Sequence, residues 1–158
     1  MRTLSALILV ATVAVPAFAD PMSDARAHDE AFEKACNAGD IPGVAALYAD
    51  DAIAIWPGAG EEAKGKDAIA KLAVGLCDPR NHNQASIKSL DAVPLDDAHI
   101  AIVGHWEVVT APPGGMRTVS EVRTTEVIAK TAAGWRYVVD HASIGEPAPK
   151  PAKKHAHK

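Results

Sequence analysis

Apolar residues in the first half of the chain recur with the period of an α-helix. Between Asp24 and Cys36, and again over 66–76, they fall every three or four positions, which predicts two amphipathic helices. Ser23 is placed to cap the first helix. The apolar positions are Ala27, Ala31, Phe32 and Ala35 in the first helix and Ala68, Ile69, Leu72, Ala73 and Leu76 in the second.

The segment between these helices reads NAGDIPGVAALYADDAIAIWP, residues 37–57. Asp40 can cap a short helix that has Pro42 in its first turn. We expect residues 49–51 to turn the chain and residues 52–56 to form an apolar strand, which the following Pro-Gly pair ends. A helix followed directly by a buried strand is an arrangement that can border a ligand pocket.

From residue 85 onward the period changes to that of β-strands. Strands are predicted over 85–93, 99–110, 117–130 and 135–143, and the run HIAIVGHWEVVT is apolar enough on both faces for the middle of a sheet. Turn residues separate the strands, most clearly PPGG at 112–115. Three helices followed by an antiparallel meander predict an α+β fold in which the helices cover one face of a curved sheet.

The two ends of the chain differ from this core. Residues 1–19 have a positive start, a short apolar run and a small-residue cleavage pattern, so we expect a cleaved export signal. The apolar run is shorter than the roughly 20 residues that span a bilayer, and no later run is apolar enough. Residues 146–158 are rich in Pro, Lys and His and predict a solvated tail. One exported domain remains over 20–145.

Charge narrows the classes of partner. The overall charge of −4 includes +1 from residues 1–19 and +3 from the tail, so residues 20–145 carry −8. Phosphate binding needs a basic face, which makes nucleic acid an unexpected partner. No spaced histidine motif indicates a metal site, and nothing in the sequence calls for a cofactor.

The sequence contains two cysteines, Cys36 and Cys77. In an exported chain they can form a disulfide that ties the end of the first predicted helix to the end of the 66–76 helix. The alternative is that both are small buried apolar residues.

Three segments give the chain a family resemblance. The NAGD to IWP segment, the helix opening GKDAI at 65–69 and the ending GWRYVVDHAS resemble the nuclear transport factor 2-like superfamily. That group includes ketosteroid isomerases, SnoaL-like polyketide cyclases and the association domain of calcium/calmodulin-dependent kinase. The resemblance implies a cone-shaped α+β fold and leaves function open, because one fold hosts many chemistries.

Individual positions argue against the best-known chemistry of that superfamily. In the isomerases that this chain resembles, the base is an Asp directly before the proline that ends the first strand, and here that residue is Trp56. An oxyanion-stabilising Tyr is replaced by Phe32, while the partner acid corresponds to Glu126. An indole cannot remove a proton from carbon, so ketosteroid isomerisation is not expected.

The same resemblance implies which residues face the inside of the cone. Pocket arginines of the association domain correspond to His105, Glu126 and Ala142. By the strand period of two, Thr124, Val103, Glu107 and Asp140 then also face inward, whereas Trp106, Trp135, Tyr137 and His141 face outward. A register slip of one residue would exchange the two sets.

These assignments lead to a small-molecule-binding pocket lined by Phe32, Tyr48, Trp56, Val103, Glu107, Thr124 and Ala142. The leading interpretation is an exported homodimer that binds a small apolar molecule. An alternative is an acid/base enzyme (cyclase, isomerase or hydrolase) that uses His105 with Glu126 or Asp140. Two further alternatives are a dimeric association module and, for the charged residues themselves, structural ion pairs with Arg123 and Arg136.

Overall fold

The computed structural model describes residues 20–57 and 62–145, so the predicted export signal and tail lie outside the described residues. The elements are α1 (Pro21–Asn37), α2 (Ile41–Ala46), β1 (Tyr48–Ile55), β2 (Glu62–Lys64), α3 (Lys66–Cys77), a 3₁₀ turn η1 (Pro79–Asn81), β3 (Gln84–Asp96), β4 (His99–Thr110), β5 (Thr118–Thr131) and β6 (Gly134–Ile144).

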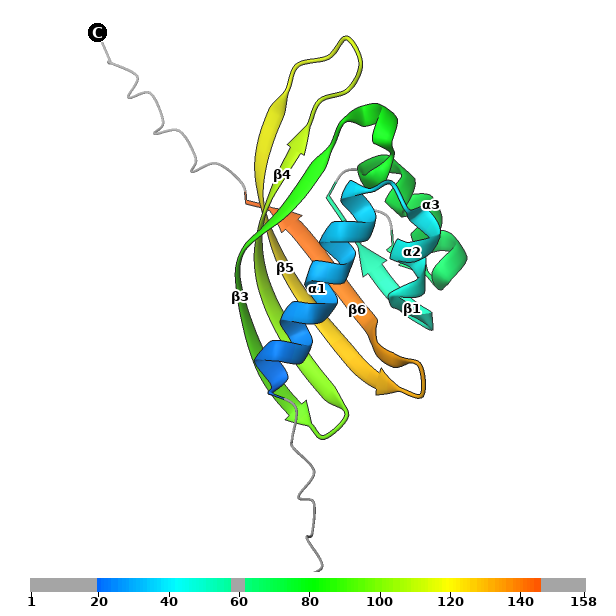
Figure 1. The fold of residues 1–158 in the computed structure, drawn as a ribbon, viewed down its shortest axis with the longest axis vertical. Helices are drawn as coiled ribbons and strands as arrows, with labels where there is room; N and C mark the ends of the chain where they lie inside the picture. Colours follow the sequence, from blue (N-terminus) through cyan, green and yellow to red (C-terminus); the bar gives the residue numbers. More distant parts are fainter. Residues whose placement is uncertain (1–19, 58–61, 146–158) are drawn as a thin grey trace, which may run out of the picture.

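The strands form one sheet in the order β2-β1-β6-β5-β4-β3 (Figure 1). Strands β3 to β6 are the predicted antiparallel meander, and β1 joins its edge parallel to β6. Helix α1 crosses the concave face of the sheet, while α2 and α3 lie beside β1 (Figure 1). The predicted α+β fold with helices against a curved sheet is confirmed.

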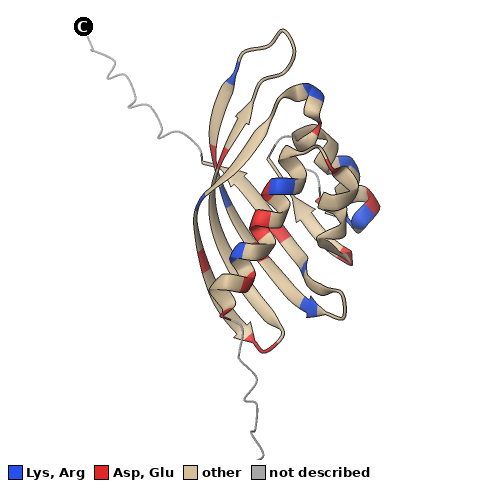
Figure 2. Cartoon of the chain, in the orientation of Figure 1, with Lys and Arg blue, Asp and Glu red and all other residues tan. Residues whose placement is uncertain are grey.

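Helix α1 has a sharply divided surface. Asp20 caps it by accepting a hydrogen bond from the Met22 backbone N–H at 3.2 Å. Its buried face consists of Ala25, His28, Asp29, Phe32 and Cys36. Acidic and basic residues both occur along α1 and α3 (Figure 2). Two polar residues therefore lie on the side of α1 that packs on the sheet.

Cys36 and Cys77 form a disulfide, which confirms the predicted pair. The bond joins the last turns of α1 and α3 across a sequence separation of 41 residues. It fixes the distance between the helix that crosses the sheet and the helix that borders its open side.

The segment after α2 differs from prediction. Residues 49–51 do not turn the chain but belong to β1, and the short strand β2 was not predicted. The pairing of β1 with β6 is irregular between Tyr48 and Ile53, and Asp50 and Asp51 lie exposed within that interruption. Lys66 contacts Asp50 at 2.7 Å. Acidic residues that normally indicate a turn are therefore accommodated by an irregular strand.

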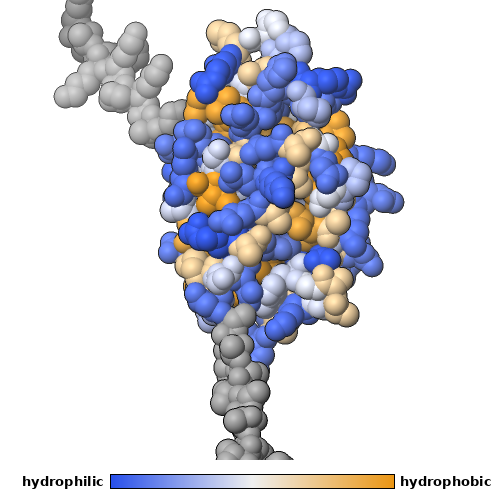
Figure 3. Space-filling model, in the orientation of Figure 1, coloured by the Kyte–Doolittle hydropathy of each residue, from blue (hydrophilic) through white to orange (hydrophobic). Residues whose placement is uncertain are grey.

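Apolar residues are distributed over the surface in small separate areas on the face shown in Figure 3. Within residues 20–57 and 62–145, no helix is both long and apolar enough to cross a membrane.

Candidate ligand-binding site

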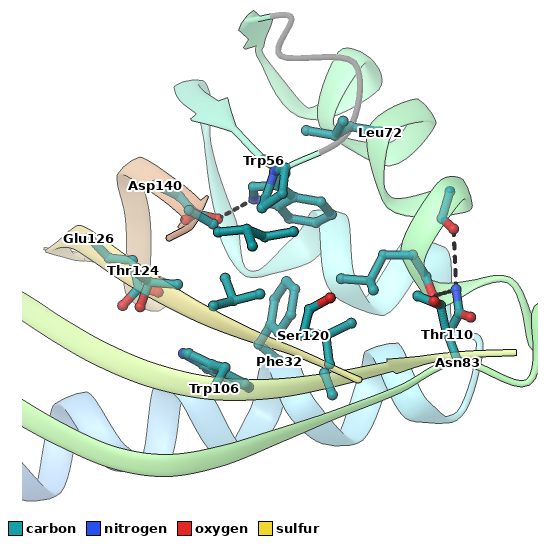
Figure 4. A pocket seen from close by; sticks show the side chains of 18 of the residues that line it. Phe32, Trp56, Leu72, Asn83, Trp106, Thr110, Ser120, Thr124, Glu126 and Asp140 are labelled. Carbon is teal, nitrogen blue, oxygen red and sulfur yellow. Dashed lines mark hydrogen bonds between the residues drawn. The ribbon is translucent and has the colours of Figure 1, made fainter. Parts of the chain in front are cut away.

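A cavity of about 580 Å³ lies between the concave face of the sheet and the helices. Phe32 of α1, Trp56 after β1 and Leu72 of α3 border it from the helical side, and Trp106 and Thr124 border it from the sheet (Figure 4). The remaining lining residues are Pro57, Lys71, Gly75, Leu76, Asn83, Ala85, Val108, Thr110, Ser120, Val122, Glu126, Tyr137, Asp140, Ala142 and Ile144.

The two ends of this cavity differ in chemistry. Glu126 and Asp140 lie together at one end, whereas Asn83 and Thr110 lie at the other (Figure 4). Asn83 is occupied in holding the chain, since its amide donates to the Leu76 carbonyl at 2.9 Å. The carboxyl end is therefore the chemically distinctive one.

The predicted orientation of β4 is wrong by one residue. Trp106 pairs with Val122 and Gly104 pairs with Thr124, so Trp106 faces the cavity. His105 pairs with Arg123 on the outer face of the sheet, and both are exposed. The inward orientation of His105 was inferred from the resemblance and not from the pattern of residues in the strand itself. An error of one residue in register reverses the direction of every side chain of the strand.

The same shift places Val103 and Glu107 on the outer face of β4. Val103 is exposed, and Glu107 contacts Lys88 at 3.2 Å. Neither borders the cavity, so both are removed from the predicted lining. No described arginine forms an ion pair with Glu126 or Asp140, which also corrects the expected pairing with Arg123 and Arg136.

On strand β6, a bulge changes the predicted alternation. Ile128 pairs with Tyr137 and Val127 pairs with Val139, so the residue between Tyr137 and Val139 has no partner on β5. As a result both Tyr137 and Asp140 face inward, although they are three positions apart and would face opposite sides of a regular strand. Tyr137 was predicted to face outward and is instead 2% exposed.

The other predicted residues are placed as follows. Phe32, Trp56, Thr124 and Ala142 border the cavity. Tyr48 does not border it, since its side chain is completely buried behind Asp140. Trp135 is half-buried with Lys130 over its ring, and His141 is exposed.

Asp140 is held by two donors. The Tyr48 hydroxyl and the Trp56 indole Nε1–H both donate to Asp140 Oδ2, each at 2.6 Å. Among the described residues no donor contacts the second oxygen, Oδ1. Since Asp140 also borders the cavity, this arrangement fixes the carboxyl and leaves one oxygen for a ligand.

A third buried carboxyl, Asp29, was not predicted. It comes from α1, is completely buried and accepts a hydrogen bond from the Tyr137 hydroxyl at 2.6 Å. Its neighbour His28 packs against the Tyr137 ring with centroids 4.2 Å apart. Asp29 lies three residues before Phe32 and seven before Cys36, so the helical spacing could have shown that it lies on the apolar face.

Burial shifts the protonation of this cluster. It raises the pKa of Asp29 to about 7, against the Tyr137 hydrogen bond and with the repulsion of Asp140. It also raises the pKa of Glu126 well above its usual value, aided by the negative charges of Asp29 and Asp140. The pKa of Asp140 is raised by burial and pulled back by its Tyr48 and Trp56 hydrogen bonds.

Three polar atoms on the sheet side of the cavity have no hydrogen-bond partner among the described residues. They are Glu126 Oε2, Thr124 Oγ1 and Trp106 Nε1. Two of them converge over Gly104, where a Cβ atom would clash with Thr124 Oγ1 and would lie 2.7 Å from Trp106 Nε1. Unpartnered buried polar atoms are uncommon and require an explanation.

The arrangement is suited to an organic ligand. In the described ranges, no group of three His, Cys, Asp or Glu side chains is arranged to hold a metal ion. The cavity combines aromatic and aliphatic walls with a small polar end, which is typical of small-molecule sites.

The chain belongs to the SnoaL-like domain family, whose model matches residues 26–147. This agrees with the resemblance drawn from the sequence to the nuclear transport factor 2-like superfamily.

Solved structures share the fold. A ketosteroid isomerase-like protein from Erwinia carotovora atroseptica has 24% identity and a TM-score of 0.68 over 82% of this chain and 100% of its own. A nuclear transport factor 2-like protein with a cystatin-like fold from Novosphingobium aromaticivorans has 18% identity and a TM-score of 0.67 over 78% and 81%.

A Xanthomonas campestris protein assigned to the calcium/calmodulin-dependent protein kinase II association domain has 20% identity and a TM-score of 0.71 over 89% of this chain and 98% of its own. No functionally curated protein matches the sequence. At these identities the structures establish the fold and not the activity.

Proposed function

We propose that this protein binds a small, mostly apolar molecule in the cavity between α1, α3 and the sheet. The observation that carries the proposal is a cavity of about 580 Å³ with aromatic and aliphatic walls and carboxyls at one end. Small-molecule sites generally measure about 300–1,000 Å³ and combine such walls with few polar groups.

The lining side chains determine how the ligand is oriented in the cavity. Its apolar body lies against Phe32, Trp56, Leu72 and Trp106, and its polar group lies at the end formed by Glu126 and Asp140 (Figure 4). Glu126 is 3% exposed and Asp140 is 6% exposed, so a polar group that reaches them leaves water almost entirely. The hydrogen bonds to Asp140 hold this end in place before the ligand arrives, which reduces the ordering required on binding.

Titration with 1-aminoanthracene, an uncharged fluorescent probe at neutral pH, tests this proposal. We expect saturable fluorescence enhancement with the full chain and its loss in Ala142→Trp, where an indole fills the cavity. Ser143→Trp is the matched control, because the adjacent residue is exposed. No enhancement by the unmodified protein, or equal enhancement by both variants, would show that this cavity does not bind such molecules.

A second candidate function is acid/base catalysis in the same cavity. Glu126 and Asp140 are direct cross-strand partners. Two donors favour the ionised form of Asp140, whereas Glu126 Oε2 has none, so the environments separate a proton-accepting group from a proton-holding one. Asp140 would then remove a proton from the bound molecule and Glu126 would return one. His105 has no part in this proposal, because it lies on the opposite face.

Deuterium incorporation tests the catalytic alternative. The protein would be incubated in D₂O with 4-phenyl-2-butanone, and mass spectrometry would follow exchange at the carbons next to the carbonyl. We expect faster exchange than in buffer and a loss of that acceleration in Asp140→Asn. Exchange that is no faster with protein than without it would leave binding as the function.

Export and dimer formation belong to the proposal as well. The Cys36–Cys77 disulfide is compatible with an oxidising compartment, and Val103 and Val139 are exposed on the outer sheet face. Mass determination of the protein recovered from the exporting cell tests cleavage after residue 19. Light scattering on the same sample distinguishes a dimer from a monomer.

A further inference from the structure

At the carboxyl end of the cavity, Glu126 and Asp140 border the space, and the buried Asp29 interacts electrostatically with both. Asp29, Glu126 and Asp140 are each less than 7% exposed. The charge of Asp140 raises the pKa of Asp29 and of Glu126, and the charge of Asp29 raises the pKa of Glu126. None of the ion pairs formed within the described residues includes any of them. Buried carboxyls normally have a cation or several donors beside them. Asp140 has two such donors and Asp29 has one, so it is Glu126 that leaves this end of the site incomplete among the described residues.

The unpartnered oxygen of Glu126 indicates where a ligand would bind. Its side chain is buried, borders the cavity and has Oε2 without a partner among the described residues. Asp140 directly across the ladder presents its free Oδ1, and Thr124 Oγ1 lies next along the same strand face. An ammonium group has three N–H donors and no acceptor, which matches a set of oxygen acceptors.

The walls next to these carboxyls also favour a cation with an apolar body. Phe32 packs edge-on against Trp56 and Trp106, with centroids 5.6 and 5.9 Å away. Aromatic rings attract an organic cation through their quadrupole and receive its hydrocarbon part. A bare metal ion is a poorer occupant, since no group of three ligands in the described ranges is arranged around one point.

We propose that the ligand carries a protonated amine, whose ammonium group lies between Glu126 and Asp140 while its apolar body lies against Phe32, Trp56 and Trp106. This inference rests on the proposed binding function and narrows it to one chemical class. An acidic ligand would place a further negative charge beside three carboxyls. A neutral alcohol would leave the carboxyls without a counter-charge.

Three ligands of the same length test the proposal: 4-phenylbutylamine, 4-phenylbutan-1-ol and 4-phenylbutanoate. Each would displace 1-aminoanthracene from the full-length protein at pH 7. We expect the amine to bind at least tenfold more tightly than the alcohol and the carboxylate to bind most weakly. Calorimetry in two buffers should show proton release with the amine alone, because the ammonium ionises a carboxyl that burial keeps protonated.

Glu126→Gln should lose most of the preference for the amine while retaining the affinity for the alcohol. Glu121→Gln is the matched control, because it makes the same chemical change on the exposed outer face of β5. If Glu126→Gln does not fold, Asp140→Asn and proton release by the unmodified protein decide the question.

The outcomes separate this inference from the function on which it rests. Equal or tighter binding of the alcohol or carboxylate, displacement by none of the three, or an amine preference that survives in Glu126→Gln would overturn the amine proposal. Binding of 1-aminoanthracene in the cavity would still support the proposed function. Failure of the dye itself would overturn both.

Discussion

The two faces of strands β4 and β5 carry similar side chains in opposite surroundings. On the outer face, Glu107 contacts Lys88 and Glu121 is exposed to solvent. On the inner face, Glu126 is almost fully buried, and no described residue forms an ion pair with it. The same residue type is thus a solvated or paired group on one side and a chemically unsatisfied group on the other.

This difference shows where the fold gives up stability. A solvated surface carboxyl costs little, whereas a buried one without a partner loses its hydration and raises its pKa. Glu126, Thr124 and Trp106 each have a buried polar atom on the inner face without a partner among the described residues. Matched substitutions on the two faces can therefore show whether this arrangement is structural or is completed by a ligand.

The largest effect is expected from Asp140→Ala compared with His141→Ala. The first change leaves the Tyr48 hydroxyl and Trp56 N–H buried without an acceptor, which should lower the free energy of unfolding by roughly 3 kcal/mol. The second, on an exposed residue, should change it by less than about 0.5 kcal/mol. Urea unfolding at pH 5 measures both, and similar losses would refute the assigned difference between the faces.

A smaller effect is expected from Gly104→Ala compared with His105→Ala. The new methyl group would contact Thr124 Oγ1 and Trp106 Nε1 and force one of them to move, so we expect a loss of roughly 2 kcal/mol. Probe binding should weaken as Trp106 shifts. His105→Ala should leave both stability and binding unchanged. Unchanged binding by Gly104→Ala would show that the space above this glycine is not part of the site.

The next prediction concerns pH. Asp29 has its pKa raised to about 7. Its contribution to the free energy of unfolding is therefore largest at low pH and is lost as pH rises from about 4 to 7. His28 has its pKa lowered to about 4 by burial and by the Arg136 charge. Its contribution to the free energy of unfolding is therefore largest above pH 6.5 and is lost as pH falls below that value. The two slopes oppose each other in the native protein.

Asp29→Asn should therefore expose the His28 slope. Relative to the unmodified protein, we expect stability at pH 8 minus that at pH 5 to increase by roughly 2 kcal/mol. Glu30→Gln, an exposed change on the same helix, is the control and should leave the difference unchanged. Chemical unfolding at the two pH values measures this difference. A pH profile identical to that of the unmodified protein would mean that the pKa of Asp29 is not raised in the folded state.

The smallest effect is expected on the outer face. Glu107→Gln removes the partner of Lys88, yet such partly exposed ion pairs contribute only about 0–1 kcal/mol. We expect a change below about 0.5 kcal/mol and no change in 1-aminoanthracene affinity. Thermal unfolding and the probe titration measure these quantities, and a loss of probe binding would show that the outer face influences the cavity.

The fold was more predictable than the site. Helical and strand periods depend on many residues at once, so the helices, the meander and the α+β class followed from the pattern. The disulfide was one of two open alternatives for Cys36 and Cys77. The position of β1 beside β6 was not predicted, because a parallel contact between distant segments leaves no local pattern.

The site depended on details that a period does not specify. One step of register placed Trp106 inward in place of His105, and one unpaired residue in β6 turned Tyr137 inward. Asp29 was missed because a charged residue on an apolar helix face reads as an exception to the pattern. Glu126 and Asp140 were both candidates from the sequence, but their partners, Tyr48 and Trp56 for Asp140, required the three-dimensional arrangement.

The bulge in β6 has a consequence for protein engineering. It lets one strand supply both the hydroxyl that holds Asp29 and the carboxyl that Tyr48 and Trp56 hold. Grafting these residues onto a regular strand of another scaffold would turn one of the two groups to the opposite side. A transplanted site must therefore include the extra residue, because the bulge is what orients both side chains to the same side.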